Sequence, residues 1–223
     1  MIPRILLDTA PLPGGGELKL FQRGDEFSIT LGGNELMNSR KSGSEEALAE
    51  LGCAGLGGRA KPRVLIGGLG MGFTLRAALA VLPKDAEVTV AELVPAVVTW
   101  ARGPMAHFHE GTLDDRRVTI AERDVAHLIA PRANWDAILL DVDNGPDGLT
   151  IEENDGLYSA KGLAAARMAL RPGGVLAIWS AAPDSAFTNR LRRAGFAVEE
   201  HRARAARGKG GQHLIWVARA PGA

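Results

Sequence analysis

A glycine-rich segment, Gly67-Gly68-Leu69-Gly70-Met71-Gly72, follows a short apolar run directly and precedes a helical pattern. Glycines at such a turn let the backbone bend sharply and approach a ligand closely, and the following helix presents free N–H donors. Glu92 ends the next apolar run, about twenty residues later, where a carboxylate accepts hydrogen bonds from the ribose hydroxyls of a nucleoside. By itself, the loop is also typical of a tight turn without a ligand.

Two further carboxylates follow the next two apolar runs. Asp124 comes after the run in TIAERDVAHL and is suited to accept the adenine amino group, and Asp141 ends the run in WDAILLDVDNGP. The carboxyl ends of successive strands converge on one crevice in an open α/β sheet. The sequence therefore predicts a nucleoside site built from Gly67, Gly68, Leu69, Gly70, Glu92, Leu93, Asp124, Val125 and Asp141.

The spacing of the glycines argues against a dinucleotide such as NAD. Gly68, Gly70 and Gly72 give a Gly-x-Gly-x-Gly pattern, whereas the dinucleotide fingerprint needs a glycine at position 73, which is Phe73 here.

Alternating strands and helices must position these residues. Apolar runs at 64–66, 88–91, 118–120, 137–140 and 175–179 alternate with helical patterns at 73–82, 94–102, 159–170 and 185–194. Such alternation predicts a parallel sheet covered on both faces. Strands at 196–202 and 212–219 are too close for a crossover helix, so they must pair antiparallel. This is the plan of an α/β, Rossmann-like class I methyltransferase domain with a mostly parallel seven-stranded sheet.

The residues before this domain predict a small β unit. Residues 17–31 alternate apolar and polar side chains around Gly24-Asp25, which indicates a hairpin. We expect Gly32-Gly33 to end the unit, a helix to run from Glu45 to Leu51 behind a Ser42–Glu45 capping box, and 52–62 to be a linker. Residues 1–60 would then form the small unit with its helix and linker, and residues 61–223 the Rossmann-like domain.

Composition limits the partners. The 223 residues carry 26 basic and 26 acidic side chains, so net charge gives no reason to expect nucleic acid. One cysteine, no signal-peptide pattern and no run of about 18 apolar residues lead to the expectation of a cytoplasmic protein without membrane spans. The five histidines lack metal-ligand spacing, so no metal is expected.

Six segments resemble the spermidine/spermine synthase family, a branch of the S-adenosylmethionine-dependent superfamily. In order they are VLIGGLGMGFTLRAAL, VTVAELVPAVVTWAR, DDRRVTIAERDVAHLI, WDAILLDVDNGP, LYSAKGL and LRPGGVLAIWS. The resemblance implies that the glycine loop, Glu92 and Asp124 hold S-adenosylmethionine, its decarboxylated form or methylthioadenosine. It also implies that Asp141 deprotonates or steers an attacking amine. Asp143 beside Asp141 would add like charge and, with burial, raise its pKa.

The acceptor contacts depart from the family. The family's GGGDGG loop carries an acid that helps to hold the polyamine, and Gly70 stands at that position. The DSSDP loop is replaced by Asp141-Val142-Asp143-Asn144, and the segments 34–37 and 42–45 supply few of the family's amine contacts. A dication needs several anions, so putrescine is not expected to be turned over.

We therefore expect an S-adenosylmethionine-dependent, methyltransferase-like group transferase. Its acceptor would be a small molecule, with amines among the candidates, contacted by Asp143, Asn144 and Tyr158. Two alternatives stay open: an aminopropyltransferase that uses decarboxylated S-adenosylmethionine, and a non-catalytic nucleoside-binding module. A homodimer is also left open.

Overall fold

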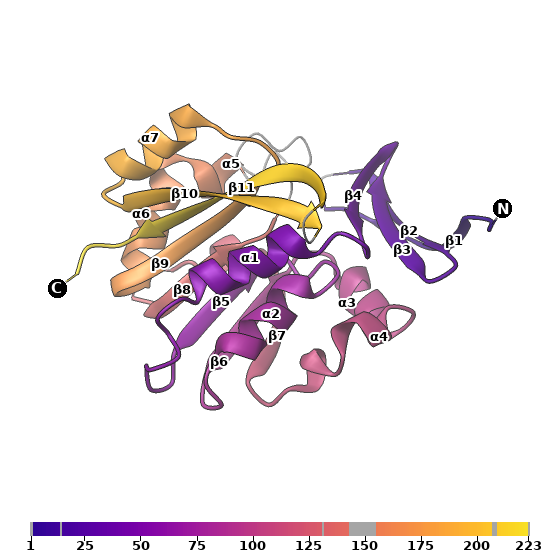
Figure 1. Cartoon of the computed structure of the whole chain (residues 1–223), viewed down its shortest axis with the longest axis horizontal. Coiled ribbons are helices and arrows are strands. Elements are labelled where there is room, and N and C mark those ends of the chain that lie inside the picture. The colour runs from indigo at the N-terminus through magenta and orange to yellow at the C-terminus, as the bar shows by residue number, and fades with distance from the viewer. Residues whose placement is uncertain (1, 14, 131, 143–154, 207–208, 223) are drawn as a thin grey trace.

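The computed structural model describes residues 2–13, 15–130, 132–142, 155–206 and 209–222, which form an α/β body and a four-stranded antiparallel sheet (Figure 1). The main sheet has the order β10-β11-β9-β8-β5-β6-β7. Its strands are β5 (Arg63–Gly67), β6 (Glu87–Glu92), β7 (Val118–Glu122), β8 (Trp135–Leu140), β9 (Leu170–Ser180), β10 (Ala197–Ala206) and β11 (Lys209–Arg219). Strands β5 to β9 are parallel, and β11 is antiparallel to both of its neighbours. The predicted fold class is confirmed.

Helices cover both faces of this sheet because its strands are apolar on both sides. Val64 and Ile66 of β5 pack into the core beneath α1 (Gly43–Gly52), α2 (Phe73–Val81) and α3 (Pro95–Arg102). Leu65, between them, packs into the opposite core with α6 (Ala160–Ala169) and α7 (Ser185–Arg193). Short helices α4 (Ala106–His109), η1 (Thr112–Asp114), η2 (Val125–His127) and α5 (Asp155–Tyr158) complete the layers. None of the described helices is long and apolar enough to cross a membrane.

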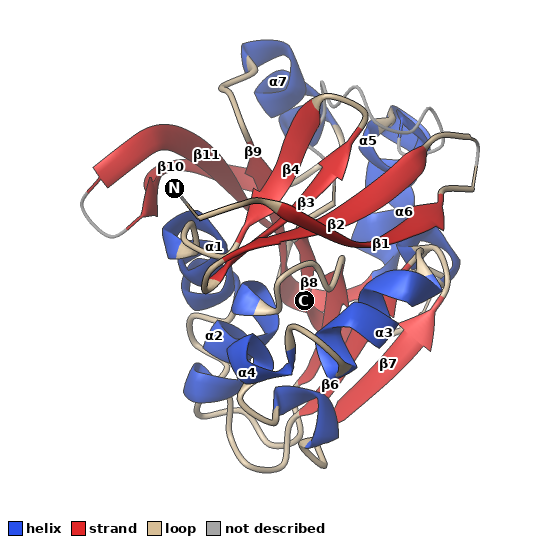
Figure 2. Ribbon diagram, turned by 90° about the vertical axis from the view of Figure 1, so that its right-hand side faces the viewer, coloured by secondary structure: helices blue, strands red, loops and turns tan. Residues whose placement is uncertain are grey.

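The N-terminal sheet is larger than the sequence predicts. It contains β1 (Ile5–Pro11), β2 (Glu17–Arg23), β3 (Glu26–Leu31) and β4 (Asn34–Asn38), paired in that order (Figure 2). The hairpin around Gly24 is confirmed, but the prediction that Gly32-Gly33 ends the unit is wrong. Gly32 has φ +56 and forms the turn into β4, whose polar first residues Asn34 and Glu35 hide the strand from pattern analysis.

Helix α1 forms where it is expected, without the expected capping box. Ser42 is the N-cap residue, yet its side chain makes no capping hydrogen bond. The hydroxyl of Ser44 instead donates to the carboxylate of Glu45 at 2.7 Å. Glu45 lies three and four residues before the buried Leu48 and Ala49, so it shares their inward face. The helix packs on α2 and on strands β8 to β11, which brings Glu45 to the main sheet.

Candidate active site

The site lies where the strand order of the main sheet reverses. From β5 the chain continues to β6 on one side, whereas β8 pairs with β5 on the other, and open α/β sheets bind ligands at the carboxyl ends of such strands. The N–H of Gly68 donates to the carbonyl oxygen of Ala91 (2.8 Å), and that of Asp141 donates to the carbonyl oxygen of Gly67 (2.9 Å). Gly68 has φ +89, and a Cβ there would lie 2.3 Å from the carbonyl oxygen of Asp141. Only glycine permits this approach.

Glu92 is buried beside the glycine loop. Its Oε2 accepts a hydrogen bond from the N–H of Leu69 (3.0 Å), and its Oε1 accepts one from the N–H of Val94 (2.9 Å). Burial raises the pKa of the Glu92 carboxyl, and these N–H groups oppose that rise. The side chain therefore fastens the loop to the end of β6, and each oxygen keeps acceptor capacity for a ligand hydroxyl.

Most of the predicted nucleoside residues line one cavity of about 120 Å³. They are Gly68, Gly70, Glu92, Leu93, Asp124, Val125 and Asp141. Leu69 lines a neighbouring cavity, and Gly67 lies beneath the loop, where a Cβ would press on Val125 at 3.1 Å. Asp124 is partly exposed and accepts a hydrogen bond from the N–H of Ala126 (2.8 Å). Leu12 and Leu18 of the N-terminal segment add apolar walls.

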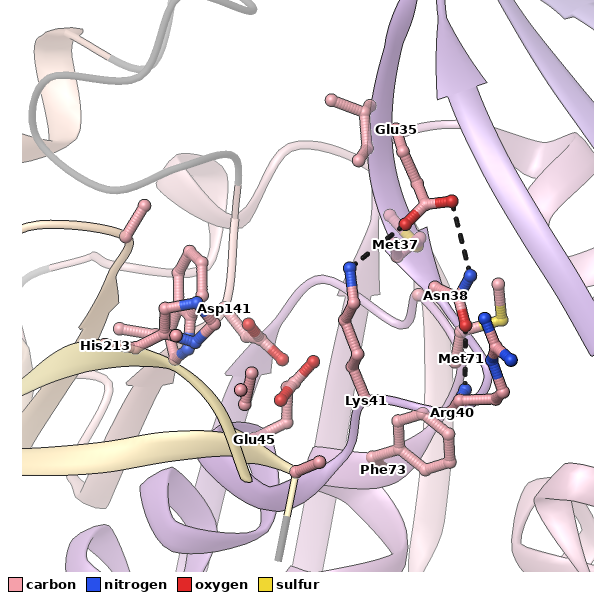
Figure 3. A pocket seen from close by; sticks show the side chains of 18 of the residues that line it. Glu35, Met37, Asn38, Arg40, Lys41, Glu45, Met71, Phe73, Asp141 and His213 are labelled. Atoms are coloured by element: carbon pink, nitrogen blue, oxygen red, sulfur yellow. Dashed lines mark hydrogen bonds and ion pairs between the residues drawn. The ribbon is translucent and has the colours of Figure 1, made fainter. Parts of the chain in front are cut away.

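A larger cavity of about 640 Å³ adjoins the first (Figure 3). Leu36, Met37, Gly70 and Asp141 line both cavities. The larger one draws its other residues from β4, the start of α1, the glycine loop, the end of β9 and the β10–β11 hairpin. Two spaces with a shared wall suit a two-part ligand or two ligands that react at their junction.

Two carboxylates face each other on the floor of the larger cavity. Figure 3 shows Glu45 of α1 and Asp141 at the end of β8 pointing toward one another. The hydroxyl of Thr74 donates to Oδ2 of Asp141 at 2.6 Å. Burial raises the pKa of Asp141 to about 6. Burial, and then the charge of Asp141, raise the pKa of Glu45 to about 7. The two groups titrate as a pair, and burial favours the protonated form of each carboxyl.

This pair changes the expected electrostatics of Asp141. The sequence predicted Asp143 as its like-charged neighbour, but the described neighbour is Glu45, which lies on another element. Asp143 and Asn144 lie outside the described residues.

Cations line the opposite wall, and each has a carboxylate partner. Lys41 Nζ lies 3.2 Å from Oε1 of Glu35, and Arg40 Nη2 lies 3.0 Å from Oε1 of Glu26. Both cationic side chains are exposed. The larger cavity is therefore acidic at its floor and mixed in charge at its mouth.

Trp179 and His213 form the side wall that the last strands contribute. Their rings pack edge to face with centroids 4.7 Å apart. His213 Nδ1 lies 2.9 Å from Oγ of Ser44, and burial, followed by the charge of Lys41, lowers the pKa of His213. The imidazole is therefore neutral at pH 7.

Tyr158 is not among the described residues that line either cavity, and its predicted contact with an acceptor stays a prediction. Its ring is buried and packs edge-on against Phe187 at 5.7 Å, and its hydroxyl lies 3.5 Å from the carbonyl oxygen of Val142. Across the described residues, no three His, Cys, Asp or Glu side chains group as metal ligands would.

The sequence does not single out Glu45 or His213 as residues of the site, although both line the larger cavity. A signal for Glu45 existed, because a carboxylate on the same helix face as Leu48 and Ala49 must be buried. The capping-box spacing from Ser42 predicts a different role for the same side chain. No local pattern marks His213, since its partner Ser44 lies 169 positions away in the chain.

We expect methylthioadenosine at about one hundred times its Kd to stabilise the protein by about 2.7 kcal/mol, and NAD to have no effect. Glu92→Ala should abolish most of the shift in melting temperature. Glu122→Ala is the matched control, because Glu122 is the exposed register partner of Glu92 on β7.

Removing one ribose hydroxyl from the ligand distinguishes two roles of Glu92, namely binding of the ribose and support of the glycine loop. The 2′-deoxy analogue of methylthioadenosine should bind the wild type more weakly, and Glu92→Ala should erase that difference between the two nucleosides. If the variant still discriminates between them as the wild type does, Glu92 is not the ribose ligand.

Glu45→Gln should stabilise the protein at alkaline pH. The raised folded-state pKa means that the stability contribution of Glu45 is complete below about pH 4.5 and is lost as the pH rises through about 7. We expect the variant to exceed the wild type by about 1–3 kcal/mol at pH 8, after allowance for its partial exposure, and to match it near pH 4.5. Urea unfolding at both pH values measures this. Glu50→Gln, on the exposed side of α1, should show no such dependence.

Comparison with known proteins agrees with this geometry. No protein-family model matches the sequence. Polyamine aminopropyltransferases of Mycobacterium tuberculosis and Mycobacterium bovis are 32% identical over 145 residues, which are 60% of this chain and 27% of each relative. The chain thus aligns with about a quarter of their length.

Solved structures match nearly the whole chain. A spermidine synthase in complex with the transition-state analogue AdoDATO and the spermidine synthase from Thermotoga maritima each have a TM-score of 0.73 at 19% identity, covering 96% of this chain and 72% of theirs. A probable spermidine synthase from Corynebacterium glutamicum has a TM-score of 0.66 at 15% identity, covering 96% and 79%. The chain therefore has the spermidine synthase fold and is homologous, over the aligned residues, to polyamine aminopropyltransferases.

Proposed function

We propose that the protein transfers an aminopropyl group from decarboxylated S-adenosylmethionine to an amine. The observation that carries this proposal is the pair Asp141 and Glu45, in which Asp141 lines both cavities and Glu45 lines the larger one. Such a pair can hold one cationic amine beside a cationic sulfonium group, and it can take up a proton as the amine becomes a nucleophile.

The residues of the smaller cavity fit the nucleoside part. Glu92 supplies acceptors for the ribose hydroxyls, Asp124 supplies one for the adenine amino group, and Leu12, Leu18 and Val97 supply apolar walls. When bound, the cofactor supplies an activated carbon next to a sulfonium, so that a C–N bond forms as the C–S bond breaks and the electron pair remains on sulfur. The chain's own residues mainly orient the reactants, since the sulfonium is already a good leaving group.

Charge favours aminopropyl transfer over methyl transfer. The arm of S-adenosylmethionine carries a carboxylate, which would approach Asp141 and Glu45, whereas the decarboxylated arm carries only an ammonium group. The homology to polyamine aminopropyltransferases supports the same choice. We therefore prefer aminopropyl transfer to the methyltransferase-like activity that the sequence first suggested.

The acceptor should carry one ammonium group near the pair. A second ammonium on a short diamine would extend toward the mouth of the cavity, where Lys41 and Arg40 lie. Gly70 offers no side-chain charge at the position where the family has an acid. A monoamine such as propylamine fits these charges better than putrescine.

A non-catalytic nucleoside-binding module is the second candidate. The partly exposed Asp124 and the glycine loop would serve binding alone equally well. The elevated pKa values of Asp141 and Glu45 favour catalysis, since a module that only binds the nucleoside has no use for a titrating pair. Release of methylthioadenosine in the presence of decarboxylated S-adenosylmethionine and amines distinguishes the two, because a binding module releases none.

Asp141→Asn should lower turnover by about two to four orders of magnitude, because it preserves shape but removes the charge and the basic oxygen. Methylthioadenosine release is measured with propylamine, ethanolamine and putrescine, beside calorimetric binding of methylthioadenosine. Nucleoside affinity should change much less than turnover. Asp25→Asn, in the exposed hairpin turn, is the control. Full turnover in Asp141→Asn would exclude the proposed role, and equal loss of binding and turnover would restrict Asp141 to cofactor binding.

Putrescine should be a poor acceptor for the wild type, and Gly70→Asp should improve it by about tenfold or more, the worth of one added charge-assisted contact. Gly70 has φ +51, a region that Asp tolerates better than most residues, and its Cβ would displace only the flexible Met37 side chain at 3.2 Å. Gly70→Asn supplies the same shape without charge. An equal gain in both variants would rule out the electrostatic explanation, and efficient putrescine turnover by the wild type would overturn the preference for monoamines.

A further inference from the structure

The larger cavity has opposite charges on two of its sides. Glu45 and Asp141 lie at its floor, whereas Lys41 lies on the wall opposite them. Figure 3 shows the Lys41 side chain directed toward Glu35 rather than toward the acidic pair. Lys41 therefore does not neutralise the pair, and a ligand that spans the cavity meets carboxylates at one end and an ammonium group at the other.

The N-terminal sheet fixes the position of Lys41. Its Nζ donates to Oε1 of Glu35 at 3.2 Å, and Nδ2 of the buried Asn38 donates to Oε2 of the same carboxylate at 3.2 Å. Burial raises the pKa of Glu35, but hydrogen bonds from Asn38 and Lys41 outweigh burial and hold the pKa below its usual value. Glu35 is therefore ionised at neutral pH and keeps the ammonium group of Lys41 at the cavity.

The ammonium group of Lys41 has room for a second acceptor. It carries three donors, and among the described residues Glu35 supplies the side-chain acceptor for one of them. The two side chains are 57% and 40% exposed, and ion pairs as exposed as this one stabilise little. A ligand carboxylate can thus join Glu35 at Lys41. The charge of Lys41 also acts inside the cavity, because it adds to burial in lowering the pKa of His213 on the side wall.

We infer that the acceptor is a straight-chain ω-amino acid, whose ammonium group lies at Glu45 and Asp141 and whose carboxylate binds Lys41. This inference rests on the proposed function and names the class of its acceptor. Each end of such a zwitterion meets the opposite charge of the cavity, whereas a diamine places its second ammonium group against Lys41. The cavity would therefore select by attraction of the amino acid and by repulsion of the diamine.

Atoms and charges balance for this acceptor. Its ammonium nitrogen loses one proton to the pair of Asp141 and Glu45, and the resulting amine attacks the carbon beside the sulfonium. A C–N bond forms as the C–S bond breaks, the electron pair stays on sulfur, and the new nitrogen is a secondary ammonium ion. The pair then releases its proton to solvent. The products are an N-aminopropyl amino acid, methylthioadenosine and one proton, and the acceptor carboxylate takes no part in bond formation.

Amines of equal length with three different ends test this assignment. With decarboxylated S-adenosylmethionine, kcat/KM should fall in the order 4-aminobutanoate, butylamine, putrescine. The first two should differ by about tenfold, the contribution of one charge-assisted hydrogen bond. The series is repeated with β-alanine and 5-aminopentanoate, each beside the alkylamine and the diamine of its own length. If the uncharged or the dicationic end gives the better acceptor at every length, the inference is wrong.

Lys41→Met removes the charge and keeps much of the length of the side chain. This variant should lose about tenfold more kcat/KM with 4-aminobutanoate than with butylamine, mainly through KM, and Lys41→Arg should recover most of the loss. Lys19→Met is the matched control, because Lys19 also pairs with a carboxylate, Glu17, at 3.8 Å but lies outside the described lining of the cavity. Equal losses with all three amines in Lys41→Met would indicate a structural role and overturn the inference.

Binding measured without turnover separates this inference from the proposed function. In protein saturated with methylthioadenosine, calorimetry should show tighter binding of 4-aminobutanoate than of butylamine, and Lys41→Met should abolish the difference. Equal binding of the two amines to the wild type would contradict the inference even in an active enzyme. Weaker binding of S-adenosylmethionine but unchanged binding of 4-aminobutanoate in Lys41→Met would assign Lys41 to the cofactor carboxylate and also contradict it. The expected binding without release of methylthioadenosine from any amine would instead overturn the proposed function alone.

Discussion

The close approach of Gly68 to the end of β8 is the constraint on which the site depends. A Cβ at this position would collide with the carbonyl oxygen of Asp141, so the loop can cross the strand only as glycine. The backbone bonds from Gly68 to Ala91 and from Asp141 to Gly67 then align the ends of three neighbouring strands. Glu92 completes the arrangement, since its two oxygens hold the N–H groups of Leu69 and Val94. Without this approach, Asp141 and Glu92 would not lie on one crevice.

The buried carboxylates of the described residues differ in whether a cation lies beside them. Asp136, at the other end of β8, is fully buried and accepts hydrogen bonds from the Arg63 N–H (2.7 Å) and from the guanidinium groups of Arg59 and Arg171. Its charge is matched by cations, as a structural carboxylate requires. For Glu45 and Asp141, the salt bridges among the described residues provide no cationic partner. The repulsion between the two carboxylates lowers the stability of the folded protein at neutral pH. The same repulsion favours binding of a cation or a proton by the pair, and functional sites often carry such a loss of stability.

The N-terminal sheet is part of the site rather than an accessory. Leu36 and Met37 of β4 line both cavities, and Lys41 follows that strand. The N-terminal sheet, which lies beside the main sheet (Figure 1), therefore contributes part of the wall of both cavities. Because Glu45 and Asp141 are themselves largely buried, the electrostatic effect of the acidic pair is stronger than it would be on an open surface.

The sequence by itself determined the main sheet and most of the residues that line the smaller cavity. Those features are local, since each apolar run ends in a loop whose glycine or carboxylate stands a fixed number of residues away. Glu92, Asp124 and Asp141 could be placed at one cavity because the topology of parallel strands brings the carboxyl ends of those strands together. The sequence does not predict strand β4, because this short edge strand begins with polar residues and follows a glycine turn, which is a pattern typical of a loop.

Only the tertiary structure decided the acidic pair and its connection to His213. Glu45 meets Asp141 across two elements, and Ser44 meets His213 across 169 positions, so neither contact leaves a periodic trace in the chain. Tyr158 shows that closeness in sequence does not decide where a side chain points. It follows the strand-end loop in the chain, yet its ring packs into the core against Phe187. These contacts are set by the packing of helices against the sheet. That packing depends on the shapes of side chains that are far apart in the chain, so a local sequence pattern does not predict it.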